Sequence, residues 1–482
     1  MRHQPDRTPA QGLRWLVPLS AALVLGGCAN FSDDGGMGAV QAIAGASLNK
    51  DVTALRSEAD AAAARATIDR LLAKPLTADG AVQVALLNNR DLQAAYNALG
   101  IAETALVQAR LPPNPTFTWS HISGSGAFEI ERQVAMNILS LATLPARAEI
   151  AADRFRQAQL KAADETLRVA AEARRAFHRA VAARELVGYL TQSQSAAEAA
   201  VQLSQQLGES GAATKLDQAR NQVFYAELAA QLATARQRVT SERERLVRAM
   251  GLWGRDLEFK LPGRLPPLPR RPHVLANVET QAVLRRVDLH SMRLETEALA
   301  KSYGLTNATR FVSLLEAAGV SKTSREEPGA ERTRQRGAEI EFQIPLFDFG
   351  AVRVRDAEQT YLQAVNRLTA KAVNVRSEAR DAYQNYRAAY DIAAHYRREV
   401  LPLRKIISDE TLLRYNAMQI DVFAVLAEAR QRIASTVAAI EAQREFWLAE
   451  TTLGTAVIGG GAAMEAGAST IATTAGETAG QH

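Results

Sequence analysis

The sequence predicts a mainly α-helical protein with a small β portion, built from two copies of one unit, a strand pair followed by a long helical hairpin. The first observation is that 146–207 contains no proline and is rich in helix-forming residues. Roughly 60 helical residues would extend on the order of 90 Å, wider than an ordinary globular domain. The second observation is that 129–134 resembles 339–344, and 216–220 resembles 426–430, both at an offset of 210 residues. A shared offset indicates an internal duplication.

The N-terminus is typical of a lipoprotein signal peptide. Three arginines accompany an apolar run, 15–25, that is too short to span a bilayer. The run ends in Leu-Gly-Gly-Cys28, which looks like the lipobox of bacterial lipoproteins, and Ala29 follows, which in such proteins implies the outer membrane. Cys28 is the only cysteine, so no intramolecular disulfide can form, and we expect Cys28 to carry lipid. A plain secretory signal with an incidental cysteine is the alternative.

Composition divides the rest of the chain. We expect 30–47, rich in Gly, Ala, Ser and Asp, to be extended, and 48–75 to be mildly helical. Five of the 16 prolines lie within 262–272, which is typical of a linker. The predicted segments are a signal peptide (1–27), a lipidated leader (28–75), a first repeat (76–261), a Pro-rich linker (262–276), a second repeat (277–460) and a disordered tail (461–482).

Each repeat opens with a helix and continues into alternating strands. The first helix reaches about Arg110, where three prolines end it, and the second copy begins at 282–289. The predicted strands are 116–121, 128–136, 311–315 and 339–347, with a short loop at 123–126 and a long, charged loop at 319–337.

The strand alternation separates acids from apolar residues. It places four glutamates on one face, with Ile130, Ile340 and Phe342 on the other. In a soluble sandwich these acids would face water, whereas in a membrane barrel they would line the lumen. Four strands cannot close a barrel, but three chains would supply twelve. The four glutamates are Glu129, Glu131, Glu339 and Glu341.

Each long helical stretch contains one break. Gly208 and Gly211 interrupt the first stretch, and 415–418 interrupts the second, which runs over 351–453. Pro402 lies inside the second stretch and should kink it.

Several functional classes find no support. The net charge of +5 is spread evenly, so binding to nucleic acid is not expected. The seven histidines lack metal-ligand spacing, and no nucleophile elbow, P-loop or dinucleotide loop occurs. The sequence therefore predicts no enzyme, no metal site and no cofactor.

Taken together, these segments resemble the TolC-type outer-membrane efflux protein family, especially its lipoprotein branch. The resemblance covers about 76–460. Its motifs are Ala-Leu-Leu-Asn-Asn-Arg-Asp-Leu at 85–92, Ile-Pro-Leu-Phe-Asp-Phe-Gly at 344–350, and Leu-Pro-Leu at 401–403 with Arg-Tyr at 414–415. The resemblance implies a homotrimer with a twelve-stranded transmembrane β-barrel in the outer membrane and a long α-helical barrel in the periplasm. It also implies a lipid-anchored, passive exit duct that docks a periplasmic adaptor and an inner-membrane pump.

The resemblance assigns roles to the two hairpin turns, here called the tips, and to the strand glutamates, which would line the barrel lumen. The tip residues expected to contact the adaptor are Gly208, Glu209, Ser210, Gly211, Tyr415, Asn416, Met418, Gln419 and Asp421. Family members often close the entrance with acids where this chain has Ala424 and Ala427, and they usually have glycine at position 418. Closure would then depend on other groups, and the candidates are Tyr415, Asp421, Glu209 and Lys215.

Two alternatives to the duct belong to other functional classes. A periplasmic adaptor or a coiled-coil structural lipoprotein would also contain long hairpins, but adaptors usually have one hairpin flanked by β-rich domains. Nothing in the residues supports a surface lipoprotein enzyme. The cargo stays open among metal ions, drugs and organic compounds, and so does the identity of the pump and adaptor.

Overall fold

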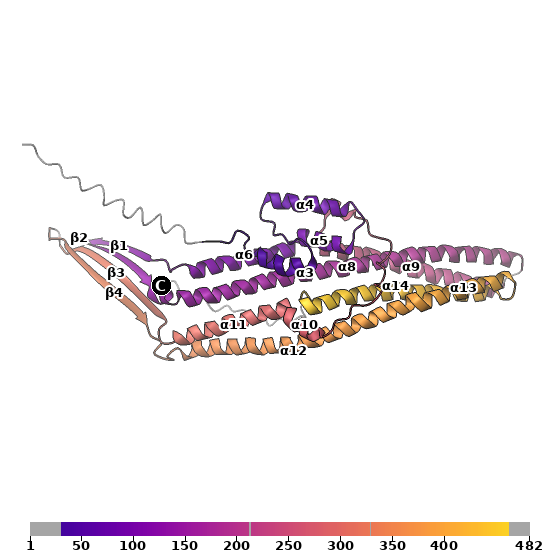
Figure 1. The fold of residues 1–482 in the computed structure, drawn as a ribbon. Coiled ribbons are helices and arrows are strands. Elements are labelled where there is room, and N and C mark those ends of the chain that lie inside the picture. The colour runs from indigo at the N-terminus through magenta and orange to yellow at the C-terminus, as the bar shows by residue number, and fades with distance from the viewer. Residues whose placement is uncertain (1–29, 212–213, 328, 462–482) are drawn as a thin grey trace, which may run out of the picture. The chain divides into compact units, whose positions relative to one another are not determined.

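A computed structural model describes residues 30–211, 214–327 and 329–461. It divides into two compact units, and Figure 1 shows the helices and strands along the chain. The described residues of the first unit lie within 1–70, 86–165 and 286–378, and those of the second within 71–85, 166–285 and 379–482. None of the helices in the described ranges combines the length and the apolar character that crossing a membrane requires. The predicted signal peptide and almost all of the predicted tail lie outside the described residues.

The long helices follow the prediction. The helical elements from the second half of the leader onward are α4 (Glu58–Leu72), α5 (Ala78–Asn88), α6 (Arg90–Arg110), α7 (Ile138–Ala142), α8 (Leu144–Glu209), α9 (Lys215–Met250), η3 (Gly254–Leu257), α10 (Val278–Arg285), α11 (Val287–Ala308), α12 (Ala351–His395), η4 (Tyr396–Val400), α13 (Leu401–Asn416) and α14 (Val422–Ile458). The break between α5 and α6, at Asn89, has its counterpart at Arg286 between α10 and α11. These positions differ by 197 residues, as the sequence repeat predicts.

Pro402 lies where the second long stretch loses its regular hydrogen bonding. The π-helical turn η4 separates α12 from α13, and Pro402 occupies the first turn of α13. Proline has no N–H to donate to the preceding turn, and widened turns commonly accommodate such a gap. The helix is therefore interrupted just before Pro402, and the kink itself stays a prediction.

The first unit contains one antiparallel sheet in the order β1-β2-β3-β4. The central pairing, β2 with β3, joins the two repeats, from Phe128↔Arg325 to Asn137↔Glu316. The strands are β1 (Thr116–Gly124), β2 (Ala127–Asn137), β3 (Leu314–Arg325) and β4 (Thr333–Gln343).

The second strand pair differs from the prediction at both ends. Residues 319–325 and 333–337 are strand rather than loop, because charged side chains are compatible with a sheet that has no buried face here. Conversely, 311–313 and 344–347 lie outside the strands. Pro345 cannot donate to a ladder, which accounts for the early end of β4.

A tight joint connects β4 to α12. Asp348 accepts hydrogen bonds from the backbone of Gly350 (3.0 Å) and Val352 (3.2 Å), capping the helix. Gly350 has a left-handed backbone (φ 72°), and a Cβ at this position would overlap the carbonyl oxygen of Arg310. Only glycine therefore fits the joint without displacing the backbone of the neighbouring segment.

The leader is more structured than the sequence predicted. Helical turns cover α2 (Met37–Val40), the π turn η2 (Gln41–Gly45) and α3 (Ala46–Leu48), where we expected an extended chain. The carboxylate of Asp34 accepts from the backbone N–H groups of Gly36 (3.0 Å) and Gly38 (2.7 Å) and so starts the first turn. Ser32 donates its N–H to Glu103 of α6 at 2.7 Å, which holds the leader on the first unit.

In the second unit, the Pro-rich linker lies along the long helices. The carbonyl of Pro266 accepts from Trp447 Nε1 (3.1 Å) and Gln443 Nε2 (2.6 Å) of α14. The Tyr390 hydroxyl of α12 donates to the carbonyl of Arg270 at 3.0 Å. Glu185 of α8 accepts the N–H of Leu265 at 2.8 Å. The linker therefore ties three helices of this unit together.

Candidate functional site

The first tip follows the end of α8. Gly211 adopts a left-handed conformation (φ 78°) and donates its N–H to the carbonyl of Gly208 at 3.1 Å. After the undescribed residues 212 and 213, α9 starts with a capping box. In this box Thr214 and Asp217 each accept the other's backbone N–H at 3.2 Å. Glu209, Ser210 and Gly211 are exposed and Gly208 is partly buried.

The second tip has the same kind of helix end, with methionine in place of glycine. Met418 is left-handed (φ 59°) and 94% exposed. Its N–H donates to Tyr415 and that of Gln419 to Arg414, each at 2.9 Å, which together form a Schellman motif. A side chain in this conformation costs roughly 1 kcal/mol. Asp421 caps α14 by accepting from the N–H of Ala424 at 2.9 Å.

Behind the tips, the two hairpins contact each other through two arginines that occupy equivalent positions in the repeats. The guanidinium of Arg220 lies 5.9 Å from the ring centre of Phe423, and that of Arg430 lies 4.8 Å from Phe224. Arg430 also donates to the carbonyl of Arg220 at 3.5 Å. Both turns consequently lie at the same end of the second unit (Figure 1). The structure thus brings the two sets of predicted tip residues together.

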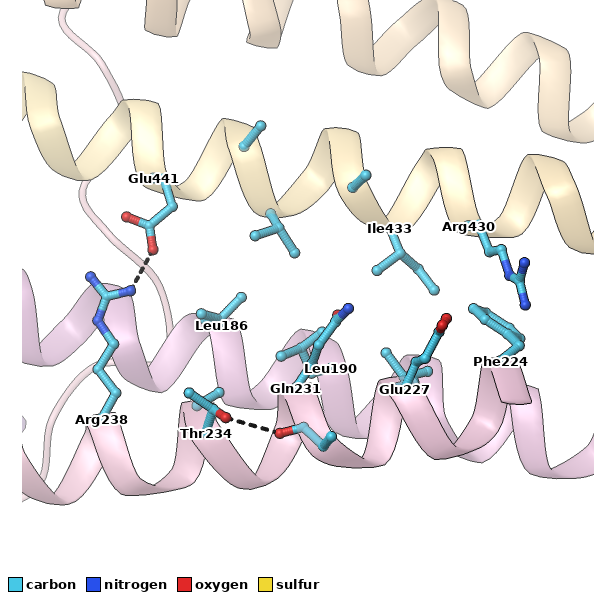
Figure 2. Close-up of a pocket in the computed structure, with 16 residues that line it drawn as sticks. Leu186, Leu190, Phe224, Glu227, Gln231, Thr234, Arg238, Arg430, Ile433 and Glu441 are labelled. Carbon is cyan, nitrogen blue, oxygen red and sulfur yellow. Dashed lines mark hydrogen bonds and ion pairs between the residues drawn. The ribbon is translucent and has the colours of Figure 1, made fainter. Parts of the chain in front are cut away.

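An open groove of about 810 Å³ lies between α8, α9 and α14 (Figure 2). Leu186, Leu190 and Ile433 give it an apolar lining. At one end Arg238 forms an ion pair with Glu441 at 2.7 Å. The sequence did not predict this groove, because its apolar residues resemble an ordinary helix-packing seam.

The four predicted strand glutamates lie in the first unit and share one face of the sheet. The register places Lys322 opposite Glu131 and Glu316 opposite Glu341. Lys322 and Glu316 therefore lie on the same face as the four glutamates. The Lys322 ammonium contacts Glu129 at 2.7 Å. Five glutamates and one lysine give this acidic face a net of four negative charges per chain. Sequence alternation missed Glu316 and Lys322 because it predicted one to be outside a strand and the other in a loop.

The opposite face is apolar near the helices, and toward the strand hairpins it carries arginines beside Phe128 and Ile130. Ile130, Ile340 and Phe342 point to this side, as the alternation predicted, together with Arg132. The observed strand ends add Arg325, Arg334 and Arg336 to it.

Cys28 lies outside the described residues, so its lipidation stays a prediction from the sequence. In the ranges that the structure does describe, no three His, Cys, Asp or Glu side chains come together as a metal site. The adaptor contacts of the tips and the lumen position of the glutamates likewise stay predictions.

Comparison with known proteins identifies the relatives of this fold. Residues 279–408, which span most of the second repeat, match the model of the outer membrane efflux protein family. No curated protein matches the chain. The resemblance to the TolC-type efflux family that the sequence predicted is confirmed by this match and by the solved structures.

Three solved channels illustrate the likeness. The Campylobacter jejuni CmeC outer membrane channel is 16% identical, with a TM-score of 0.66 over 80% of this chain and 86% of CmeC. The outer membrane protein VceC of Vibrio cholerae is 14% identical, with a TM-score of 0.64 over 79% and 96%. The open state of the Neisseria gonorrhoeae MtrE outer membrane channel is 15% identical, with a TM-score of 0.65 over 79% and 88%.

At these identities the structural likeness establishes the fold, a mainly helical chain with a small antiparallel sheet. The family match and the channels also support the prediction that the chain is not an enzyme, since efflux proteins and channels move molecules rather than convert them.

Proposed function

We propose that this chain, which has the fold of the outer-membrane efflux channels, is the outer-membrane exit duct of a tripartite efflux system. It acts passively, as a homotrimer whose strands form the membrane barrel and whose long helices extend into the periplasm. A periplasmic adaptor and an inner-membrane pump complete the path and supply the energy.

The observation that carries this proposal is a sheet with two chemically opposite faces and two open edges. Within the described chain, β1 pairs only with β2, and β4 only with β3. Unpaired edges expose backbone groups that require a partner, and lipid offers none. Three copies would supply twelve strands and close the sheet. The acidic face then surrounds water, while the apolar face contacts lipid.

Cysteine pairs test the closure between copies. Thr118→Cys on β1, combined with single cysteines from Gln335 to Gln343 on β4, is expected to give a disulfide-linked trimer in one register. Cys28 is the only native cysteine. Gln133→Cys on the inner strand β2, combined with the same β4 series, is the matched control and should stay monomeric under denaturing conditions. Absence of crosslinks from every β1 pair, in protein recovered with the outer membrane, would exclude the closed barrel.

The tips are proposed to contact the adaptor. Both are exposed, both have left-handed helix ends, and the apolar groove between α8, α9 and α14 belongs to the same unit. Photo-crosslinking from Ser210 and Gln419 should capture the adaptor in cells. The strand-hairpin residue Ser125 serves as the control and should give no adaptor product. If only Ser125 yields adaptor crosslinks, the orientation is wrong.

The acidic face is proposed to make the duct cation-selective. Charges of one sign along a narrow lumen raise the local concentration of the opposite ion. Replacing Glu131, Glu339 and Glu341 with glutamine should lower the cation-to-anion permeability ratio by roughly twofold or more in planar-bilayer recordings. This variant leaves the Glu129–Lys322 ion pair in place.

Lys322→Gln is a control that should change the same measurement in the opposite direction. It removes the one positive charge on the acidic face of the described strands, which should raise the cation-to-anion permeability ratio. Screening over about 8 Å at physiological salt predicts that both effects shrink at high ionic strength. Identical reversal potentials for the wild type and both variants would show that these side chains do not set the lumen field.

A further inference from the structure

The sheet face opposite the glutamates carries a cluster of arginines toward the strand hairpins. The register places Arg132 and Arg336 in one row, on either side of Ser321. Neighbouring strands lie about 4.8 Å apart, so the two backbones are about 10 Å apart. Within the described strands no acidic residue lies on this face. These residues, Arg132, Arg325, Arg334 and Arg336, form the basic face.

An apolar band separates these arginines from the helices. Val134, Ala338, Ile340 and Phe342 lie on the same side, and Phe342 is six residues from Arg336, roughly 20 Å along an antiparallel strand. Trp119 pairs with Arg132 across β1 and β2 and is 58% exposed. An aromatic ring beside a basic row is typical of the boundary between hydrocarbon and headgroups.

The guanidinium groups are available to a ligand. Arg132, Arg334 and Arg336 are exposed, and none forms an ion pair within the described residues. The loop between β3 and β4 contains three glutamates at 326, 327 and 331, and none pairs with these arginines. Nearer the hairpins, Arg325 and Arg332 both lie over the ring of Phe128, at 5.2 and 5.6 Å.

The membrane environment restricts where such arginines can lie. On the lipid-facing side of a barrel strand, arginine is costly at the bilayer centre and well tolerated near the headgroups. A row of arginines beyond an apolar band therefore lies at headgroup level. A guanidinium group binds phosphate through two parallel hydrogen bonds, which makes arginine suited to phosphate-bearing ligands.

We propose that the basic face binds phosphate-bearing lipid headgroups of net negative charge in the leaflet next to the strand hairpins. The lipid's acyl chains lie against the apolar band, and its phosphates contact Arg132, Arg334 and Arg336. This inference rests on the proposed barrel, because only a barrel directs this face toward lipid. The adjoining apolar band favours a lipid over a free anion, since a soluble phosphate would make no use of it.

Native mass spectrometry of the detergent-solubilised trimer, titrated with diphosphorylated lipid A, tests the proposal. The triple substitution Arg132→Gln, Arg334→Gln and Arg336→Gln is expected to weaken lipid A binding at least tenfold. The corresponding lysine variant should lose less, because it retains charge but not the two-pronged geometry. Lys322→Gln, which removes a cation from the opposite face, should bind lipid A like the wild type. Inorganic phosphate and phosphatidylcholine should not compete.

Unchanged lipid A binding in the triple variant, or equal binding of phosphatidylcholine, would overturn the proposal. If the triple variant does not assemble, Arg334→Gln with Arg336→Gln serves as the second variant, judged by the same criteria. A wild-type trimer that conducts in bilayers but binds lipid A independently of the arginines overturns this inference alone. A chain that neither trimerises nor conducts overturns the proposed function, and this inference with it.

Discussion

Arg286→Ala is expected to lower the free energy of unfolding by about 3 kcal/mol, because it removes the buried cation that Asp288 and Glu378 share. The Arg286 side chain is 5% exposed, and its Nε lies 2.9 Å from Asp288. Its Nη1 forms an ion pair with Glu378, while Lys371 contacts Asp288 at 2.8 Å. Burial raises the pKa of Asp288, but Arg286 and Lys371 outweigh it and hold that pKa below its usual value.

Thermal or denaturant unfolding of the solubilised protein measures the loss. Arg285→Ala is the matched control, since Arg285 is the exposed neighbour, and its effect should stay within about 0.5 kcal/mol. The stability loss of Arg286→Lys should fall between those of Arg285→Ala and Arg286→Ala, because lysine keeps the charge but lacks the planar, two-pronged guanidinium group. Equal losses for Arg285→Ala and Arg286→Ala would show that the buried cluster does not stabilise the fold.

His178 is expected to make the protein less stable in acid. The side chain is 3% exposed and stacks on Trp447, with ring centres 5.2 Å apart. Burial, and secondarily the charge of Arg174, lowers the pKa of His178 from 6.5 to about 4, with Asp79 acting in the opposite direction. Between these two pH values the unfolded chain binds a proton that the folded chain does not. Stability therefore falls as the pH drops below about 6.5 and stops falling, for this group, below about 4.

His178→Phe keeps an aromatic ring in the stack and removes the titration. Between pH 7.5 and 4.5, the wild type should lose ~2.5 kcal/mol more unfolding free energy than this variant. Acid unfolding that is the same for His178→Phe and the wild type would rule out His178 as its source.

The helices were predictable from sequence because local chemistry determines them. The first tip follows from Gly208 and Gly211, which weaken a helix, and from Thr214, which starts the next one. Pro402 likewise predicted that the second long helix is interrupted, and η4 lies at that interruption. The strand ends could not be predicted as well. Charged residues such as Arg334 and Arg336 favour a loop in a sequence-based prediction. They are compatible with a strand here because every residue of β4 is exposed.

Partners distant in sequence were the least predictable. Asn89 and Arg286 occupy equivalent positions in the two repeats, yet Asn89 caps its helix by accepting from Leu92 at 3.1 Å. Arg286 instead pairs with Glu378, 92 residues away. The composition of the linker indicated a connection, but nothing local indicated that the Pro266 carbonyl would accept from Trp447. In the candidate site, Lys322 was missed for the same reason, since only the register brings it to Glu129.

The glycine joint before α12 has a mechanical consequence. A helix of 45 residues is a lever roughly 68 Å long. Tilting its base by about 5° would displace the far end of that helix by roughly 6 Å, more than one helical turn. An added Cβ at Gly350 must push against the backbone of Arg310 rather than against a flexible side chain. A single methyl group added at Gly350 would thus displace the other end of α12 by more than it displaces the base of that helix.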